Sequence, residues 1–78
     1  MKMRREVTED ELLNILNSEL YNHAQLKKCS FISVKRSKPD GTGCNWSAEV
    51  RCSGVSHHIS APVTGKIAAE AKRKYNLK

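Results

Sequence analysis

Aromatic side chains are scarce in this chain. Only 5% of its 78 residues are Phe, Trp or Tyr, so its core has to be built mainly from aliphatic side chains. No run approaches the roughly 20 apolar residues that a membrane-spanning helix needs. A chain of this length has room for one domain, and such a small domain buries a modest share of its surface. We therefore expect a single thin-cored domain with no membrane partner.

Cysteine is rare as well. The three cysteines, Cys29, Cys44 and Cys52, are odd in number and not closely paired, whereas small secreted domains usually carry an even, denser set. The basic start of the chain is followed by acidic residues and not by the apolar run of a secretory signal. We expect reduced, partly buried thiols and a cytoplasmic location.

Acidic residues are outnumbered by basic ones. The chain has 14 Lys and Arg against 8 Asp and Glu, a formal net charge of +6. Nucleic acid and acidic protein surfaces are the natural partners of such a charge. A need for solubility explains the charge equally well, so charge alone does not choose between these interpretations.

Residues 1–7 resemble a flexible basic arm, and a helix is predicted from about residue 9 to about residue 23. Thr8 and Glu11 form a capping box, in which each side chain satisfies a backbone N–H that the helix start leaves free. Apolar residues then recur at helical spacing. These residues are Leu12, Leu13, Leu16 and Leu20, with Ile15 on the flank.

Two strands with a tight turn are predicted next. Residues 30–37 are typical of a strand, and residues 44–52 alternate apolar and polar side chains as a half-buried strand does. Between them, Pro39-Asp40-Gly41 predicts a three-residue hairpin turn with Gly41 in the left-handed conformation. This turn would place Val34 opposite Trp46 and Ile32 opposite Ala48 on the inner face.

A second helix is predicted after Gly54. Residues 55–59 are interpreted as a loop or a short third strand, and Ser60-Ala61-Pro62 as the start of the helix, because proline is tolerated in a first turn. The inner stripe of this helix comprises Val63, Ile67, Ala68, Ala71 and Tyr75. The fold class is therefore α+β, of order αββα, with both helices on one face of a short antiparallel hairpin and residues 8–78 forming the single domain.

Metal binding and catalysis find little support in the sequence. Cys44 and Cys52 are eight positions apart on one predicted strand, about 26 Å, so they share neither a metal nor a disulfide while that strand is intact. They are interpreted as small core residues. Cys52 with His57 or His58 is the one local pair left for a metal site or a nucleophile–base dyad. We expect no enzyme, no cofactor and no small-molecule substrate.

Basic residues are concentrated in the hairpin and the second helix. Phosphate contacts require such clusters. The candidate nucleic-acid-binding residues are Lys35, Arg36, Lys38, Arg51, Lys66, Lys72, Arg73 and Lys74. Phe31 falls on the outer face by strand parity, where it could stack on a base. The alternative, which the scarcity of aromatic residues favours, is that Phe31 turns into the core.

The order of elements resembles, in outline, the double-stranded RNA-binding domain, which places basic residues at the start of its last helix. Lys66 alone lies near that position here, so no residue roles are carried over. The segments Gly43-Cys44-Asn45-Trp46 and Arg51-Cys52-Ser53-Gly54, with the Ala-rich last helix ending in Tyr75-Asn76-Leu77, also resemble small uncharacterised proteins of bacteria and their phages. That resemblance implies no activity.

The sequence thus leads to two functional hypotheses. The first is a small non-enzymatic module that binds nucleic acid through its basic surface. The alternative is a protein–protein adaptor or phage-type accessory protein that self-associates through an open sheet edge.

Overall fold

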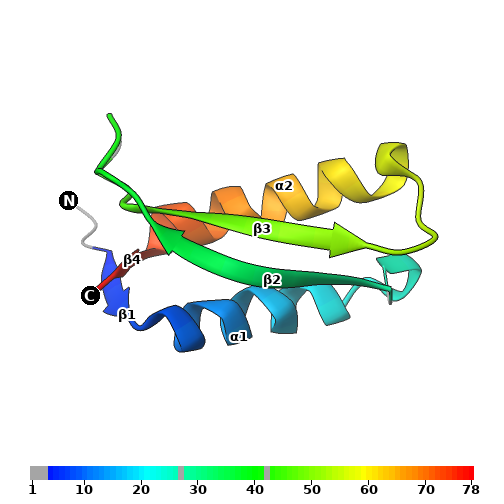
Figure 1. The fold of residues 1–78 in the computed structure, drawn as a ribbon, viewed down its shortest axis with the longest axis horizontal. Coiled ribbons are helices and arrows are strands. Elements are labelled where there is room, and N and C mark those ends of the chain that lie inside the picture. The colour runs from blue at the N-terminus through cyan, green and yellow to red at the C-terminus, as the bar shows by residue number, and fades with distance from the viewer. Residues whose placement is uncertain (1–3, 27, 42) are drawn as a thin grey trace.

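The computed structural model describes residues 4–26, 28–41 and 43–78 of the chain. Two helices lie side by side against one face of a β-hairpin, and a short parallel strand pair joins the two ends of the chain (Figure 1). The elements in chain order are β1 (Arg5–Val7), α1 (Glu9–Tyr21), a single 3-10 turn (Ala24–Leu26), β2 (Cys29–Arg36), β3 (Trp46–Cys52), α2 (His57–Lys74) and β4 (Tyr75–Leu77). The predicted α+β class, with two helices and an antiparallel hairpin, is confirmed.

Helix α1 begins at the predicted cap. The Glu11 N–H donates to Thr8 Oγ1, and the Thr8 hydroxyl donates to Glu11 Oε1, both at 3.1 Å. The buried residues of α1 are Leu12, Leu16 and Leu20, all 0% exposed. Their spacing of four residues forms one apolar stripe, which packs mainly on β2. The helix ends at Tyr21, two residues before its predicted end.

The prediction of a flexible arm over residues 1–7 is wrong for Arg5–Val7, and residues 1–3 lie outside the described residues. These residues form β1, which pairs in parallel with β4, so that Val7 lies opposite Leu77. Val7 is 1% and Leu77 2% exposed. Because both side chains complete the core, the two chain ends are tied together beside the start of α1.

The hairpin loop differs from the predicted tight turn. The Ser37 N–H donates to the Asn45 carbonyl at 2.8 Å, and beyond this pair the loop closes around Asp40. Asp40 N–H donates to the Cys44 carbonyl, and the Gly43 N–H donates to the Asp40 carbonyl, each at 3.0 Å. Gly43 has a φ of +89°, so this residue, and not Gly41, takes the conformation that only glycine adopts at low cost.

The longer loop shifts the strand register. Val34 lies opposite Ala48, and Arg36 opposite Trp46, two residues away from the predicted pairs. A bulge between Phe31 and Ser33 adds one residue to β2. Phe31 and Val34 therefore share the inner face in spite of their odd spacing. Ile32, predicted on the inner face, is 40% exposed instead.

The strand β3 alternates as predicted, although it begins at Trp46 and not at Cys44. Its inner face carries Trp46, Ala48 and Val50. Its other face is polar and exposed, with Ser47, Glu49 and Arg51. This face is the outer surface of the two-stranded sheet.

Helix α2 begins earlier than predicted. Its N-cap is Ser56, whose Oγ accepts from the His58 N–H at 3.3 Å. Residues 57–59 are therefore helical and form neither a loop nor a third strand. Pro62 lies inside the helix, where its missing N–H removes one backbone bond. The sequence-based start was wrong because it placed the proline in the first turn.

Candidate nucleic-acid interface

Basic side chains from three separate segments meet at one end of the molecule. This end contains both chain ends, the hairpin loop and the last turn of α2 (Figure 1). Arg36 Nη2 donates to the Lys78 carbonyl, and Arg4 Nε donates to the Lys72 carbonyl at 2.6 Å. We call this surface the basic end. Its residues are Arg4, Arg36, Lys38, Lys72, Arg73, Lys74 and Lys78.

A hollow beside α2 belongs to this surface. It has a volume of about 580 Å³ and lies between the helix, the hairpin loop and the start of the chain. Its ionisable lining consists of Arg4, Lys66, Lys72, Arg73, Asp40 and Glu70. Four cations against two carboxylates leave the hollow positive, as an anion-binding surface requires. Asp40 is also engaged structurally, because its Oδ1 accepts from the Cys44 N–H at 3.3 Å.

Lys72 is held in place by the core. Its Nζ lies 5.8 Å from the centroid of the Trp46 ring, a cation–π contact that is worth about 0.5–1 kcal/mol at partly exposed sites. The Trp46 indole N–H donates to the Tyr75 carbonyl at 3.0 Å. Trp46 is only 2% exposed. It therefore positions Lys72 but offers no ring face to a ligand.

Five of the eight predicted residues lie together at the basic end. The other three lie at different distances from it. Arg36, Lys38, Lys72, Arg73 and Lys74 lie at the basic end. Lys66 is seven residues before Arg73 on the same face of α2, about 10 Å away along the helix. Lys35 lies on the outer sheet face beside Arg36, opposite Ser47.

Arg51 lies elsewhere. It is opposite Ser30 on the outer sheet face. Ser30 is six residues from Arg36 along β2, a separation of about 20 Å. Arg51 therefore does not belong to the basic end, although Arg36 and Arg51 were both predicted to belong to one nucleic-acid-binding surface.

Phe31 does not take part in the interface. It is 4% exposed, as the alternative interpretation of this residue expected. The bulge rotates it inward, so it cannot stack on a base. Two residues of the basic end, Arg4 and Lys78, are not among the eight candidates. They lie next to β1 and β4, and strands of three residues carry no periodic pattern that the sequence could reveal.

Acidic residues limit the basic end on one side. The parallel pairing of β1 with β4 places the start of α1 near the end of α2. The first turn of α1 contributes Glu9, Asp10 and Glu11, all exposed. The positive surface therefore extends from the hairpin loop along α2 and stops at α1.

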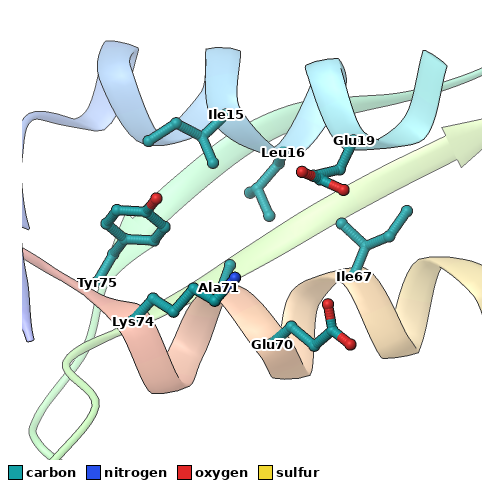
Figure 2. Close-up of a pocket in the computed structure, with 8 residues that line it drawn as sticks. All are labelled: Ile15, Leu16, Glu19, Ile67, Glu70, Ala71, Lys74 and Tyr75. Carbon is teal, nitrogen blue, oxygen red and sulfur yellow. The ribbon is translucent and has the colours of Figure 1, made fainter. Parts of the chain in front are cut away.

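The cleft between the helices is too small for a substrate. It has a volume of about 40 Å³, room for a few water molecules at most. Figure 2 shows Ile15 and Leu16 of α1 facing Ile67 and Ala71 of α2 across it, with polar side chains at its margins. This is a gap in the packing of α1 against α2.

The expectation of reduced thiols is wrong for two of the three cysteines. Cys29 and Cys52 lie directly opposite each other on β2 and β3 and form a disulfide. Spacing along one strand excludes a Cys44–Cys52 pair, but it does not predict the Cys29–Cys52 pair, because strand register cannot be deduced from spacing. Because the sulfur of Cys52 is bonded to Cys29, Cys52 can neither act as a nucleophile with His57 or His58 as its base nor bind a metal ion together with them. Cys44 is a free thiol, 2% exposed.

The described residues contain neither a metal-binding cluster nor a membrane-spanning helix. Within residues 4–26, 28–41 and 43–78, no three His, Cys, Asp or Glu side chains form a group that could hold a metal ion. None of the helices described is long and apolar enough to cross a membrane. Comparisons with protein-family models, with curated proteins and with solved structures found no match to this chain.

Proposed function

We propose that this protein is a small non-enzymatic module that binds nucleic acid through the basic end. The observation that carries the proposal is the convergence of Arg36, at the end of β2, and Lys38, in the hairpin loop, with Lys72–Lys74 from the last turn of α2. Segments that are far apart in the sequence then present one positive surface. Lysine and arginine side chains in such a cluster neutralise phosphates and release counterions, which drives association.

The recognition is expected to be independent of sequence. Specific readout needs side chains that reach base edges or stack on bases. The two aromatic residues with the largest apolar rings, Phe31 and Trp46, are 4% and 2% exposed. The basic end therefore supplies contacts to the phosphate backbone, and neither Phe31 nor Trp46 offers it a ring face for stacking.

A pair of matched charge reversals tests this proposal. Arg73→Glu with Lys74→Glu changes two exposed residues of the basic end, whereas Lys28→Glu with Arg51→Glu makes the same charge change at the opposite end of the hairpin. In fluorescence anisotropy with random-sequence DNA and RNA, the first variant should bind at least about tenfold more weakly than the wild type. The second should bind nearly as the wild type does. Equal loss in both variants would mean that only net charge matters and would refute a defined interface.

A cytoplasmic location stays a prediction, and the Cys29–Cys52 disulfide argues against it. Disulfides persist mainly in oxidising compartments, whereas cytosolic thiols are kept reduced. The oxidation state of Cys29 and Cys52 in cells, trapped by alkylation at the moment of lysis, decides between these locations.

The alternative, a protein–protein adaptor, is supported by the outer edge of β3, which pairs with no strand of the described residues. It depends on the edge of the hairpin and not on the basic end, so the two proposals can fail independently.

A further inference from the structure

Among the described residues, the strand β3 pairs with β2 along one edge and with no strand along the other. Antiparallel residues alternate between facing their partner strand and facing away from it. Ser53 N–H donates to the Lys28 carbonyl at 3.1 Å, so the backbone of Val50, three residues earlier, points away from β2. The same alternation turns the backbone of Ala48 and Cys52 to that edge. Their N–H and C=O groups therefore face away from β2, and they bond to no turn, loop or cap of the described part of the chain.

The edge of β2 is different at the matching position. Phe31, opposite Val50, also directs its N–H and C=O away from the hairpin. Both groups are bonded to the side chain of Asn17 in α1. The fold thus closes the edge of β2 at this level and leaves the edge of β3 open there.

A groove runs beside the open edge. It has a volume of about 420 Å³, and Val50, Cys52 and Val55 line it on the strand side. On the helix side it is lined by Ala61, Thr64 and Gly65 of α2. A Cβ built at Gly65 would have no atom within 4 Å. The helix therefore leaves space where an added side chain would lie.

We propose that the β3 edge accepts an extended segment of a partner protein as a third, antiparallel strand. Backbone bonds to Ala48, Val50 and Cys52 would supply affinity, and a small apolar residue opposite Val50 would enter the groove. Glu49 and Arg51 flank Val50 on the exposed outer face. The segment therefore carries a basic residue opposite Glu49 and an acidic residue opposite Arg51, because opposite charges stabilise directly opposed pairs.

A single segment fits this edge better than a second copy of the whole chain. Two helices packed side by side have a combined width of about 20 Å, whereas a sheet of two strands is only about 10 Å wide. One added strand therefore extends the sheet over the uncovered part of α2. Symmetric pairing of two β3 strands would give a sheet about 20 Å wide with four helices on one face, which need about 40 Å. The helices α2 of the two copies would collide.

A blocked hexapeptide, Ser-Ala-Glu-Val-Arg-Ser, is a suitable probe. It repeats residues 47–52 with Ser in place of Cys52, and it lacks the helices that would collide if a whole second copy paired with this edge. When its Val lies opposite Val50 in antiparallel pairing, its Arg faces Glu49 and its Glu faces Arg51. The matched control is Ser-Ala-Arg-Val-Glu-Ser, which has the same composition but places like charges opposite each other. In NMR titrations of the intact oxidised chain, the probe should shift the amides of Ala48, Val50 and α2 residues 60–65. The control should bind about tenfold more weakly.

A substitution in the groove provides a second test. Gly65→Gln fills the groove and improves helix propensity, so the fold is kept while binding of the probe should be lost. Ala69→Gln, at an exposed position one turn further along α2, is the control and should leave binding unchanged. Equal binding of both peptides, shifts confined to other surfaces, or no shifts at millimolar peptide would overturn the proposal. Concentration-dependent dimers whose interface maps to β3 would also overturn it, in favour of a second copy.

Discussion

The side-chain amide of Asn17 makes two hydrogen bonds to the backbone of Phe31. Asn17 Nδ2 donates to the Phe31 carbonyl at 3.1 Å, and Asn17 Oδ1 accepts from the Phe31 N–H at 2.7 Å. The contact joins α1 to β2 beside the bulge. It satisfies two backbone groups that the hairpin itself leaves unpaired, so it holds Phe31 in its inward position.

Asn17→Ala should lower the free energy of unfolding by about 1–2 kcal/mol, because it leaves two partly buried backbone groups of Phe31 without a partner. Asn14→Ala, at an exposed position on the same helix, should change it by less than about 0.5 kcal/mol. Urea denaturation followed by circular dichroism measures both. Similar values for the two variants would show that the Asn17 amide does not stabilise the bulge.

The thiol count of the oxidised protein should be one. With Cys29 and Cys52 bonded to each other, only Cys44 can react, and its burial should make it slow to react until the protein is unfolded. Titration with a thiol reagent, in buffer and in denaturant, gives both quantities. Three reactive thiols in denaturant without reductant would contradict the pairing.

Reduction of the disulfide should destabilise the domain. The loop between the two cysteines spans a sequence separation of 23, and closing a loop of about this length stabilises a protein by about 3 kcal/mol in the chain-entropy model. Urea denaturation with and without reductant measures the difference. The variant Cys29→Ser with Cys52→Ser should behave as the reduced wild type does, and an unchanged midpoint in both cases would contradict the prediction.

The pairing of β1 with β4 should contribute to stability. Leu77→Ala removes a side chain that is 2% exposed and should cost about 2–5 kcal/mol. Tyr21→Ala, at a position that is 70% exposed, is the control and should cost little. Thermal unfolding compares them. If Leu77→Ala unfolded at the same temperature as the wild type, the strand pair would not belong to the core.

The elements with strong local patterns were predictable from the sequence. The Thr8–Glu11 cap and the leucine spacing determined the start and the buried face of α1. The alternation along β3 determined which of its side chains face the helices. In both cases the information lies within a few neighbouring residues, so no knowledge of the tertiary fold was needed.

The remaining features depend on contacts between distant residues. The bulge at Ile32 and the position of Gly43 in the loop set the register, and the register decides that Cys29 lies opposite Cys52. The strands β1 and β4 are each three residues long and form only because their partner is present. The basic end could be predicted only in part. The clusters of basic residues in the hairpin and in α2 are visible in the sequence, but the position of the chain ends beside them depends on the pairing of β1 with β4.

The salt dependence of nucleic-acid binding tests the central claim most directly. For duplex DNA, the logarithm of the binding constant should fall linearly with the logarithm of salt concentration, with a slope of about −0.9 for each phosphate contacted. The basic end predicts a slope of about −4 for the wild type, reduced in magnitude by about 2 in the variant Arg73→Glu with Lys74→Glu. No binding at low salt, or a slope that this variant leaves unchanged, would contradict the account.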